Sequence, residues 1–182
     1  EVIKILSNFR TDLQGKHFGV IRVFTQNCKE GYEIASYRRD ISKGRDTKGL
    51  DRKVQLDNVS LQDDLQRRDI TINALVYDIE NNKIIDLVNG VNDLNNKTIS
   101  TVGEASKRFD EDRLRILRTI RFAARYNFKL DDKTKNAINY DNRLFGISDI
   151  DDVSQERIIE EVYKMWEYSY KKKDYTLLSN YF

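Results

Sequence analysis

The chain carries two groups of charged residues whose types and spacing could bind a nucleotide. One is the triplet Arg67-Arg68-Asp69, and the other runs from Arg108 to Arg125, where six Arg outnumber three acidic residues. Each group alone is typical of a solvated surface, because acidic residues early in a helix and basic residues further on are favourable placements. The longer segment nevertheless has a net charge of +3 in a chain whose formal net charge is +2. This local excess of positive charge favours binding of phosphate groups.

Within the longer segment, four charged residues recur at every third position. They would form a slowly drifting stripe along one side of the single helix that apolar spacing predicts for residues 104–126; they are Asp112, Arg115, Arg118 and Arg121. Arginine matches the geometry of phosphate oxygens with paired hydrogen bonds. We therefore expect a triphosphate to be held by four guanidinium groups, those of Arg68, Arg115, Arg118 and Arg121.

The first two members of the stripe could also read a nucleobase. An ionised Asp112 only accepts hydrogen bonds and Arg115 only donates them. Cytosine and adenine offer an amino donor beside a ring-nitrogen acceptor, whereas uracil and guanine offer a carbonyl acceptor beside an N–H donor. One Asp–Arg pair therefore predicts acceptance of C and A and rejection of U and G, because opposed donors or acceptors in a dry pocket stay unsatisfied.

The elements that must position these residues indicate an α+β fold up to about residue 100. Aromatic and β-branched residues predict strands at 17–25 and 32–38 that form a hairpin, with 26–31 as its turn. A second, shorter hairpin is predicted at 76–79 and 83–87. The charged stretch 41–57 is predicted to be an exposed loop.

Helices are predicted around and after these strands. Ser60 is typical of a helix N-cap with Asp63 three residues later, and Ser154 is typical of another. The predicted helical segments are 60–67, 71–75, 104–126, 132–140, 155–170 and a last one from Asp174 onward. In the segment 155–170 the expected apolar seam is Ile158, Val162, Met165 and Trp166. After residue 100 the chain is predicted to be entirely helical.

Composition excludes several classes of protein. The single cysteine, Cys28, excludes an internal disulfide framework and a cysteine-cluster zinc site. The single histidine, His17, excludes sites with several histidine ligands. No apolar run approaches the roughly 20 residues that span a bilayer. We therefore expect no membrane partner, and the absence of a targeting signal favours the cytoplasm.

Four segments of the sequence resemble the class II family of tRNA nucleotidyltransferases and bacterial poly(A) polymerases, which includes the CCA-adding enzymes. Residues 67–78 (RRDITINALVYD) are similar to the RRDFTINAL motif of the family, and residues 84–94 (IIDLVNGVNDL) to its DPFGGxxDL motif. Residues 101–128 match its EDxxR motif and neck helix, and residues 153–161 (VSQERIIEE) its last motif. The resemblance runs from about residue 17 to residue 157.

The resemblance implies a role for several residues. Asp112 and Arg115 fall on the pair that reads the base of the incoming nucleotide, while Arg68, Arg118 and Arg121 fall on positions that hold the nucleotide. Glu33 falls where the family has a third carboxylate facing the metal site, and Glu111 where a residue orients the helix. The implied domains are a partial head at 1–100, a neck at 101–145 and the start of a body at 146–182.

The implied activity is Mg²⁺-dependent addition of C, C and A from CTP and ATP to the 3′ end of tRNA. The family binds Mg²⁺ through an Asp-x-Asp pair upstream of the segment that corresponds to His17, and that pair is absent from this sequence. We therefore expect a truncated chain that is inactive alone. The alternatives are a poly(A) polymerase or A-adding relative, and a non-catalytic nucleotide- or RNA-binding module. The sequence does not predict an oligomeric state.

Overall fold

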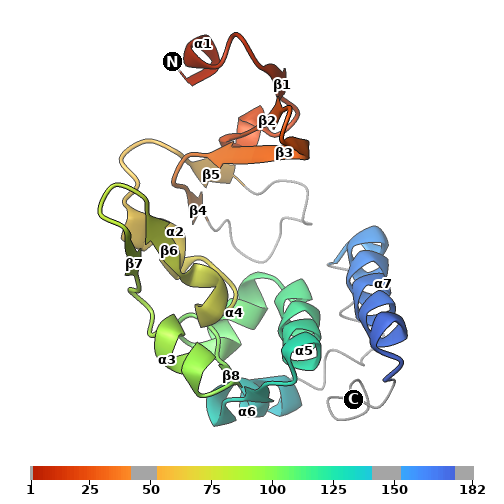
Figure 1. The fold of residues 1–182 in the computed structure, drawn as a ribbon. Coiled ribbons are helices and arrows are strands. Elements are labelled where there is room, and N and C mark those ends of the chain that lie inside the picture. The colour runs from red at the N-terminus through yellow and green to blue at the C-terminus, as the bar shows by residue number, and fades with distance from the viewer. Residues whose placement is uncertain (1, 42–52, 141–152, 175–182) are drawn as a thin grey trace. The chain divides into compact units, whose positions relative to one another are not determined.

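The computed structural model describes residues 2–41, 53–140 and 153–174 (Figure 1). The chain divides into two compact units, the first containing Glu1–Ile41 and Lys53–Asp64 and the second beginning its described part at Leu65. The expected domain boundaries after residues 100 and 145 stay predictions.

The first unit contains a three-stranded antiparallel sheet in the order β1-β2-β3. Its elements are α1 (Val2–Ile5), β1 (Arg10–Asp12), the 3₁₀ turn η1 (Lys16–Phe18), β2 (Val20–Thr25) and β3 (Cys28–Ala35). The predicted hairpin is therefore confirmed, but its first strand begins later than expected, because residues 16–18 form η1 and Gly19 follows with a φ of 70°. Its turn is also shorter than expected, since β3 already begins at Cys28.

Two short strands border the segment that was predicted to be an exposed loop. β4 (Arg39–Ile41) pairs antiparallel with β5 (Lys53–Gln55). The prediction of a loop over 41–57 is therefore wrong at both ends, because backbone hydrogen bonds between the two strands override the polar composition there. Residues 42–52 lie outside the described residues.

The predicted capping box at the start of α2 (Leu61–Gln66) is confirmed. The Ser60 hydroxyl accepts a hydrogen bond from the Asp63 N–H at 3.2 Å, and the Asp63 carboxylate accepts one from the Ser60 N–H at 3.0 Å. The Arg39 guanidinium, 2.7 Å from Asp63, and the Ser60 hydrogen bonds together lower the pKa of Asp63 to about 2. The cap therefore keeps its charge well into acidic solution.

The second unit begins with short elements that support the Arg-Arg-Asp segment. They are η2 (Thr71–Ala74), β6 (Val76–Asp78), β7 (Lys83–Ile85), α3 (Gly90–Asn95) and β8 (Thr98–Ile99). The predicted hairpin is confirmed as β6 and β7. The segment predicted as helix 71–75 is a 3₁₀ turn, η2. The Thr71 hydroxyl donates to the buried Asp93 carboxylate at 2.6 Å, which ties η2 to α3.

Gly90 allows α3 to approach η2 closely. A Cβ at this position would lie 2.4 Å from the Thr71 carbonyl oxygen. The Asp86 carboxylate meanwhile accepts hydrogen bonds from the N–H groups of Val88, Gly90 and Val91. Burial alone raises the pKa of Asp86, but these backbone hydrogen bonds outweigh it and keep the pKa below its usual value. The turn before α3 is thus held by an ionised carboxylate.

We expect Gly90→Ala to destabilise the protein because the new methyl group meets backbone that cannot rotate away. Overpacking of this kind costs about 1–3 kcal/mol. Gly103→Ala is the matched control, since its Cβ would meet nothing within 4 Å and only the φ of +77° is unfavourable. Urea denaturation of both variants measures the difference. Equal losses of unfolding free energy would show that the close approach at Gly90 is not what requires glycine.

The rest of the second unit is mostly helical, but the prediction that the chain is entirely helical after residue 100 is wrong, because residues 129–130 form a short strand that pairs with β8. A break in the predicted long helix was also not expected. The elements of this part are α4 (Ala105–Glu111), α5 (Leu114–Tyr126), β9 (Lys129–Leu130), α6 (Asp132–Tyr140) and α7 (Gln155–Lys172). The single helix expected over 104–126 is therefore wrong: Asp112 separates α4 from α5 with an extended backbone, φ −158° and ψ 103°. The Asp112 carboxylate accepts from the Leu114 N–H, and such local bonds compete with helix formation.

Helix α7 packs on α5 along a face different from the one expected. The Ser154 cap is confirmed, since its hydroxyl accepts from the Arg157 N–H. Met165 is buried and joins the core of Ala105, Phe109, Ile116 and Ile120. Val162 and Trp166 are about half exposed, so the seam predicted through them is wrong. The buried positions besides Met165 are polar, Glu161 and Ser169, and apolar periodicity does not detect them.

A second core cluster lies under the short parallel pair β8 and β9 and contains Ile70, Ile99, Phe122 and Ala123. It connects the Arg-Arg-Asp segment to α5 through direct packing. Among the residues that the structure describes, none of the helices has the length and apolar character needed to cross a membrane. The helix expected from Asp174 onward lies outside the described residues.

Candidate nucleotide-binding site

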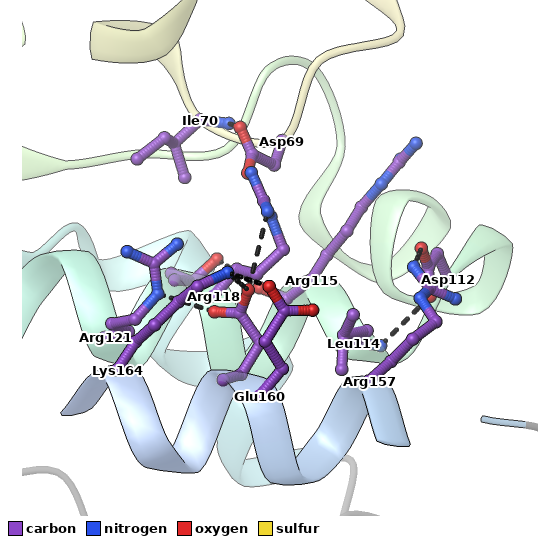
Figure 2. Close-up of polar contacts among 12 residues, drawn as sticks. Asp69, Ile70, Asp112, Leu114, Arg115, Arg118, Arg121, Arg157, Glu160 and Lys164 are labelled. Atoms are coloured by element: carbon purple, nitrogen blue, oxygen red, sulfur yellow. Dashed lines mark hydrogen bonds and ion pairs between the residues drawn. The ribbon is translucent and has the colours of Figure 1, made fainter. Parts of the chain in front are cut away.

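The predicted site residues of the second unit lie in three places. Arg115, Arg118 and Arg121 are on α5, Arg68 follows α2, and Asp112 is in the break before α5 rather than on the helix. Figure 2 shows Asp112 beside Arg157, and Arg118 between Asp69 and α7. Because Asp112 is outside the helix, its direction is set by its hydrogen bonds and not by helical periodicity.

Asp112 has 8% side-chain exposure, and its contacts include one with α5 and one with α7. Its Oδ1 accepts from the Leu114 N–H at 3.2 Å, and its Oδ2 accepts from Nη2 of Arg157 at 3.0 Å. Asp112 is thus fixed in direction by contacts from α5 and α7.

Arg115 is buried, and its guanidinium is held by a residue of α4 and by the Arg-Arg-Asp segment. Its Nη1 donates to Glu111 at 2.6 Å, and its Nη2 donates to the carbonyl oxygen of Arg67 at 3.1 Å. Glu111, which was expected to orient the helix, therefore contacts the Arg115 side chain directly. The donor of the predicted base-reading pair is fixed as firmly as the acceptor.

Of the three α5 arginines predicted to bind the nucleotide, Arg118 is the most exposed, with 35% of its side chain accessible. Its Nε and Nη2 both lie 2.7 Å from Oδ2 of Asp69. Burial alone lowers the pKa of Arg118, but the charges of Asp69 and Glu161 outweigh it and raise the pKa above its usual value. The guanidinium stays charged throughout any pH range in which the protein folds.

Arg121 is buried between α5 and α7. Its Nε donates to Oε2 of Glu161 at 2.5 Å, and its guanidinium carbon lies 4.2 Å from the centre of the Phe122 ring. Glu161 also lies 3.6 Å from both Arg118 and Lys164. The structure thus brings Arg118 and Arg121 together through one shared carboxylate.

The remaining two predicted residues have local partners. Nη1 of Arg68 donates to the Asn73 carbonyl oxygen at 2.9 Å, which holds the Arg-Arg-Asp segment against η2. Glu33 is on β3 in the first unit and forms an ion pair of 2.7 Å with Arg22 across the β2–β3 hairpin. This ion pair raises the pKa of Arg22.

Sequence reasoning did not assign roles to three residues that hold the site together, Asp69, Arg157 and Glu161. A signal was available for each, because Asp69 belongs to the Arg-Arg-Asp triplet and the other two to the segment 153–161. Charge pairing across 40 to 49 residues of sequence cannot be inferred from local spacing. The packing of α7 beside α5 reveals Arg157 and Glu161, and the position of the Arg-Arg-Asp segment beside α5 reveals Asp69.

The described residues contain no group of three or more His, Cys, Asp or Glu side chains that could hold a metal ion. Glu33, the one residue expected to face a metal, is engaged by Arg22. These residues do not form a Mg²⁺ site, so no step of the chemistry below is assigned to a metal.

Residues 1–100 match the family model described as the Poly A polymerase head domain. The chain belongs to the Poly A polymerase head domain family. This confirms the resemblance inferred from the four motifs and, with the structural similarities below, the α+β fold class.

Curated relatives of this family member are CCA-adding enzymes. One from Lactobacillus helveticus is 43% identical over 136 residues, covering 75% of this chain and 32% of its own length. One from Staphylococcus epidermidis is 36% identical over 169 residues, covering 91% of this chain and 39% of its own length. The chain therefore spans roughly a third to two fifths of the length of these relatives.

Solved structures of the family have the same fold. A Bacillus stearothermophilus CCA-adding enzyme in complex with CTP matches with a TM-score of 0.69 and 33% identity, covering 86% of this chain and 34% of that one. A tRNA nucleotidyltransferase complexed with a primer tRNA and an incoming ATP analog matches with a TM-score of 0.65 and 25% identity, covering 93% and 46%. Both are similar to this chain along most of its length.

Proposed function

We propose that this chain is the nucleotide-selecting part of an enzyme that adds C, C and A from CTP and ATP to the 3′ end of tRNA. The observation that carries the proposal is the arrangement of Asp112 and Arg115. An acceptor and a donor, three residues apart and both buried, are each fixed by separate partners, Arg157 and Glu111. A fixed pair of this kind can read the edge of a base without a nucleic-acid template.

Base selection follows from hydrogen-bond chemistry. The Asp112 carboxylate accepts from the exocyclic amine of C or A, and Arg115 donates to the neighbouring ring nitrogen. Uracil and guanine place a carbonyl oxygen against the carboxylate and an N–H against the guanidinium. A mismatched bidentate contact costs about 1–3 kcal/mol.

The triphosphate is bound by Arg68, Arg118 and Arg121, whose charge suits phosphate and whose contacts carry no base information. The 3′-hydroxyl oxygen of the RNA then loses its proton to solvent and forms a bond to the α-phosphorus, while the bond from phosphorus to the pyrophosphate oxygen breaks and pyrophosphate leaves. We assign a catalytic role to the carboxylate of Glu33. The proposed cofactor of the complete enzyme is Mg²⁺. Because tRNA is the acceptor, we place the reaction in the cytoplasm.

The alternative within the same family is a poly(A) polymerase or another A-adding enzyme. The Asp–Arg pair accepts adenine as readily as cytosine, so base reading alone does not separate the two. Use of CTP does.

Isothermal titration of the chain with each of the four ribonucleoside triphosphates tests the proposal. We expect CTP and ATP to bind, and UTP and GTP to bind at least about tenfold more weakly. Binding of ATP without CTP would instead support the A-adding alternative. Equal binding of all four would contradict base selection by Asp112 and Arg115.

A further inference from the structure

Glu161 is a buried carboxylate whose neighbours are mostly the proposed phosphate ligands. It is only 3% exposed. Its Oε2 lies 2.5 Å from Nε of Arg121, and its Oε1 lies 3.6 Å from Nη1 of Arg118 and 3.6 Å from Nζ of Lys164. Figure 2 shows Arg118 and Arg121, from α5, on the side that faces α7 and Lys164.

Glu161 lies on the same face of α7 as Arg157, which contacts the proposed base-reading residue Asp112. Arg157, four residues earlier on the same helix, donates to Asp112. Residues four apart lie on one helix face, separated by about 6 Å along the axis. One face of α7 therefore contacts the base-reading aspartate with one turn and the phosphate-binding arginines with the next.

A buried ion pair is a poor way to gain stability, because the cost of removing two charges from water offsets much of their attraction. An apolar pair of similar volume between α5 and α7 would hold the helices together as well. What a carboxylate adds is direction: it fixes the plane and orientation of each guanidinium that it contacts. Glu161 contacts Arg121 through Nε and faces a terminal nitrogen of Arg118.

The charges around Arg118 also indicate that Glu161 acts by orienting the arginines. Asp69 and Glu161 place two negative charges beside Arg118. Both charges would repel a triphosphate bound to that arginine. By Coulomb's law alone, removing Glu161 would strengthen phosphate binding. A carboxylate at position 161 therefore favours phosphate binding only on one condition. The gain from orienting the two arginines must exceed the repulsion between the carboxylate and the triphosphate.

We propose that Glu161 is a positioning residue that orients Arg118 and Arg121 for the triphosphate of the incoming nucleotide. The inference rests on the proposed function and deepens it, because it assigns to α7 a role in binding the phosphates. Misplacing a binding group by about 1 Å can cost up to roughly a hundredfold. Losing the orientation should therefore outweigh the relief of repulsion.

The test compares Glu161→Gln with Glu160→Gln, which makes the same charge change at the neighbouring position of α7. Glu160 is exposed and pairs with Lys164 at 2.7 Å. Titration calorimetry measures the Kd of CTP and of CMP for each variant. We expect Glu161→Gln to weaken CTP about tenfold or more while CMP changes little, so that the advantage of CTP over CMP shrinks. Glu160→Gln should leave both affinities unchanged.

A second substitution, Glu161→Asp, keeps the charge on a side chain one methylene shorter. We expect it to recover part of the CTP affinity that Glu161→Gln loses. If Glu161→Gln does not fold, Glu161→Asp carries the test alone, with a weakening of CTP and not of CMP as the expected result.

Three results would overturn the inference. They are tighter CTP binding by Glu161→Gln, unchanged CTP binding, and an equal loss of CTP and CMP, which would assign Glu161 to folding only. If the unsubstituted chain binds neither CTP nor CMP, the result contradicts the proposed function itself. That outcome is distinct from all three.

Discussion

Asp112→Ala is expected to lower the preference for C and A over U and G by one to two orders of magnitude. The substitution removes the acceptor for the exocyclic amine of C and A, and it removes the repulsion that a carbonyl oxygen of U or G meets. The loss corresponds to about 1–3 kcal/mol of discrimination. Titration of all four nucleotides should show weaker CTP and ATP together with stronger UTP or GTP.

Asp110→Ala is the matched control for this change. Asp110 is an exposed acidic residue in the last turn of α4, so its loss makes the same charge change at a position outside the proposed base-reading pair. The structure also gives Asp112 a second role, because it accepts from the Leu114 N–H at the start of α5. If Asp112→Ala weakens all four nucleotides equally, that role in the helix turn is the only one, and the assignment of Asp112 to base reading is wrong.

Arg121→Ala is expected to lower the free energy of unfolding by about 3 kcal/mol, because it leaves the buried Glu161 carboxylate without its nearest cation. Arg125→Ala is the control: it lies one turn further along α5 and is exposed. A surface substitution of this kind changes stability by about 0.5 kcal/mol or less. Urea denaturation of both variants measures the difference. A loss for Arg121→Ala no larger than that of the control would show that the Arg121–Glu161 pair does not stabilise the packing of α5 on α7.

The same variant also tests the assignment of Arg121 to the phosphates. At a temperature where it remains folded, it should bind CTP and ATP with a similar loss of affinity, because phosphate contacts carry no base information. Loss of only one of the two nucleotides would show that Arg121 acts on base selection instead.

Elements with local signals were predictable from the sequence. The caps at Ser60 and Ser154, the helix at Asp132–Tyr140 and the β6–β7 hairpin depend on neighbouring residues, and each is present in the structure. The break at Asp112 was not predicted, because the apolar spacing of α4 and α5 is continuous across it. A single hydrogen bond from Leu114 to the Asp112 side chain competes with the helix there, and periodicity does not register it.

The candidate site was predicted as a set of ligand-binding residues but not as a network. Asp112, Arg115, Arg118 and Arg121 stand out by type and spacing, whereas their partners depend on which face of α7 packs on α5. That face is marked by Glu161 and Met165 rather than by the apolar residues Val162 and Trp166. A buried acid at a helix interface has the sequence signature of a surface residue, so only tertiary structure identifies it.

The extended backbone at Asp112 has a consequence for how nucleotide preference can evolve. A φ of −158° is accessible to every amino acid except proline, whereas a position inside a helix selects against β-branched residues and glycine. Substitutions at Asp112 therefore meet no penalty from the main chain, and their cost lies in the side-chain contacts alone. The residue that we assign to the choice of base can thus be substituted without backbone strain, at the cost of the hydrogen bond that it accepts from the Leu114 N–H and of its ion pair with Arg157. New base preferences could arise there in single steps.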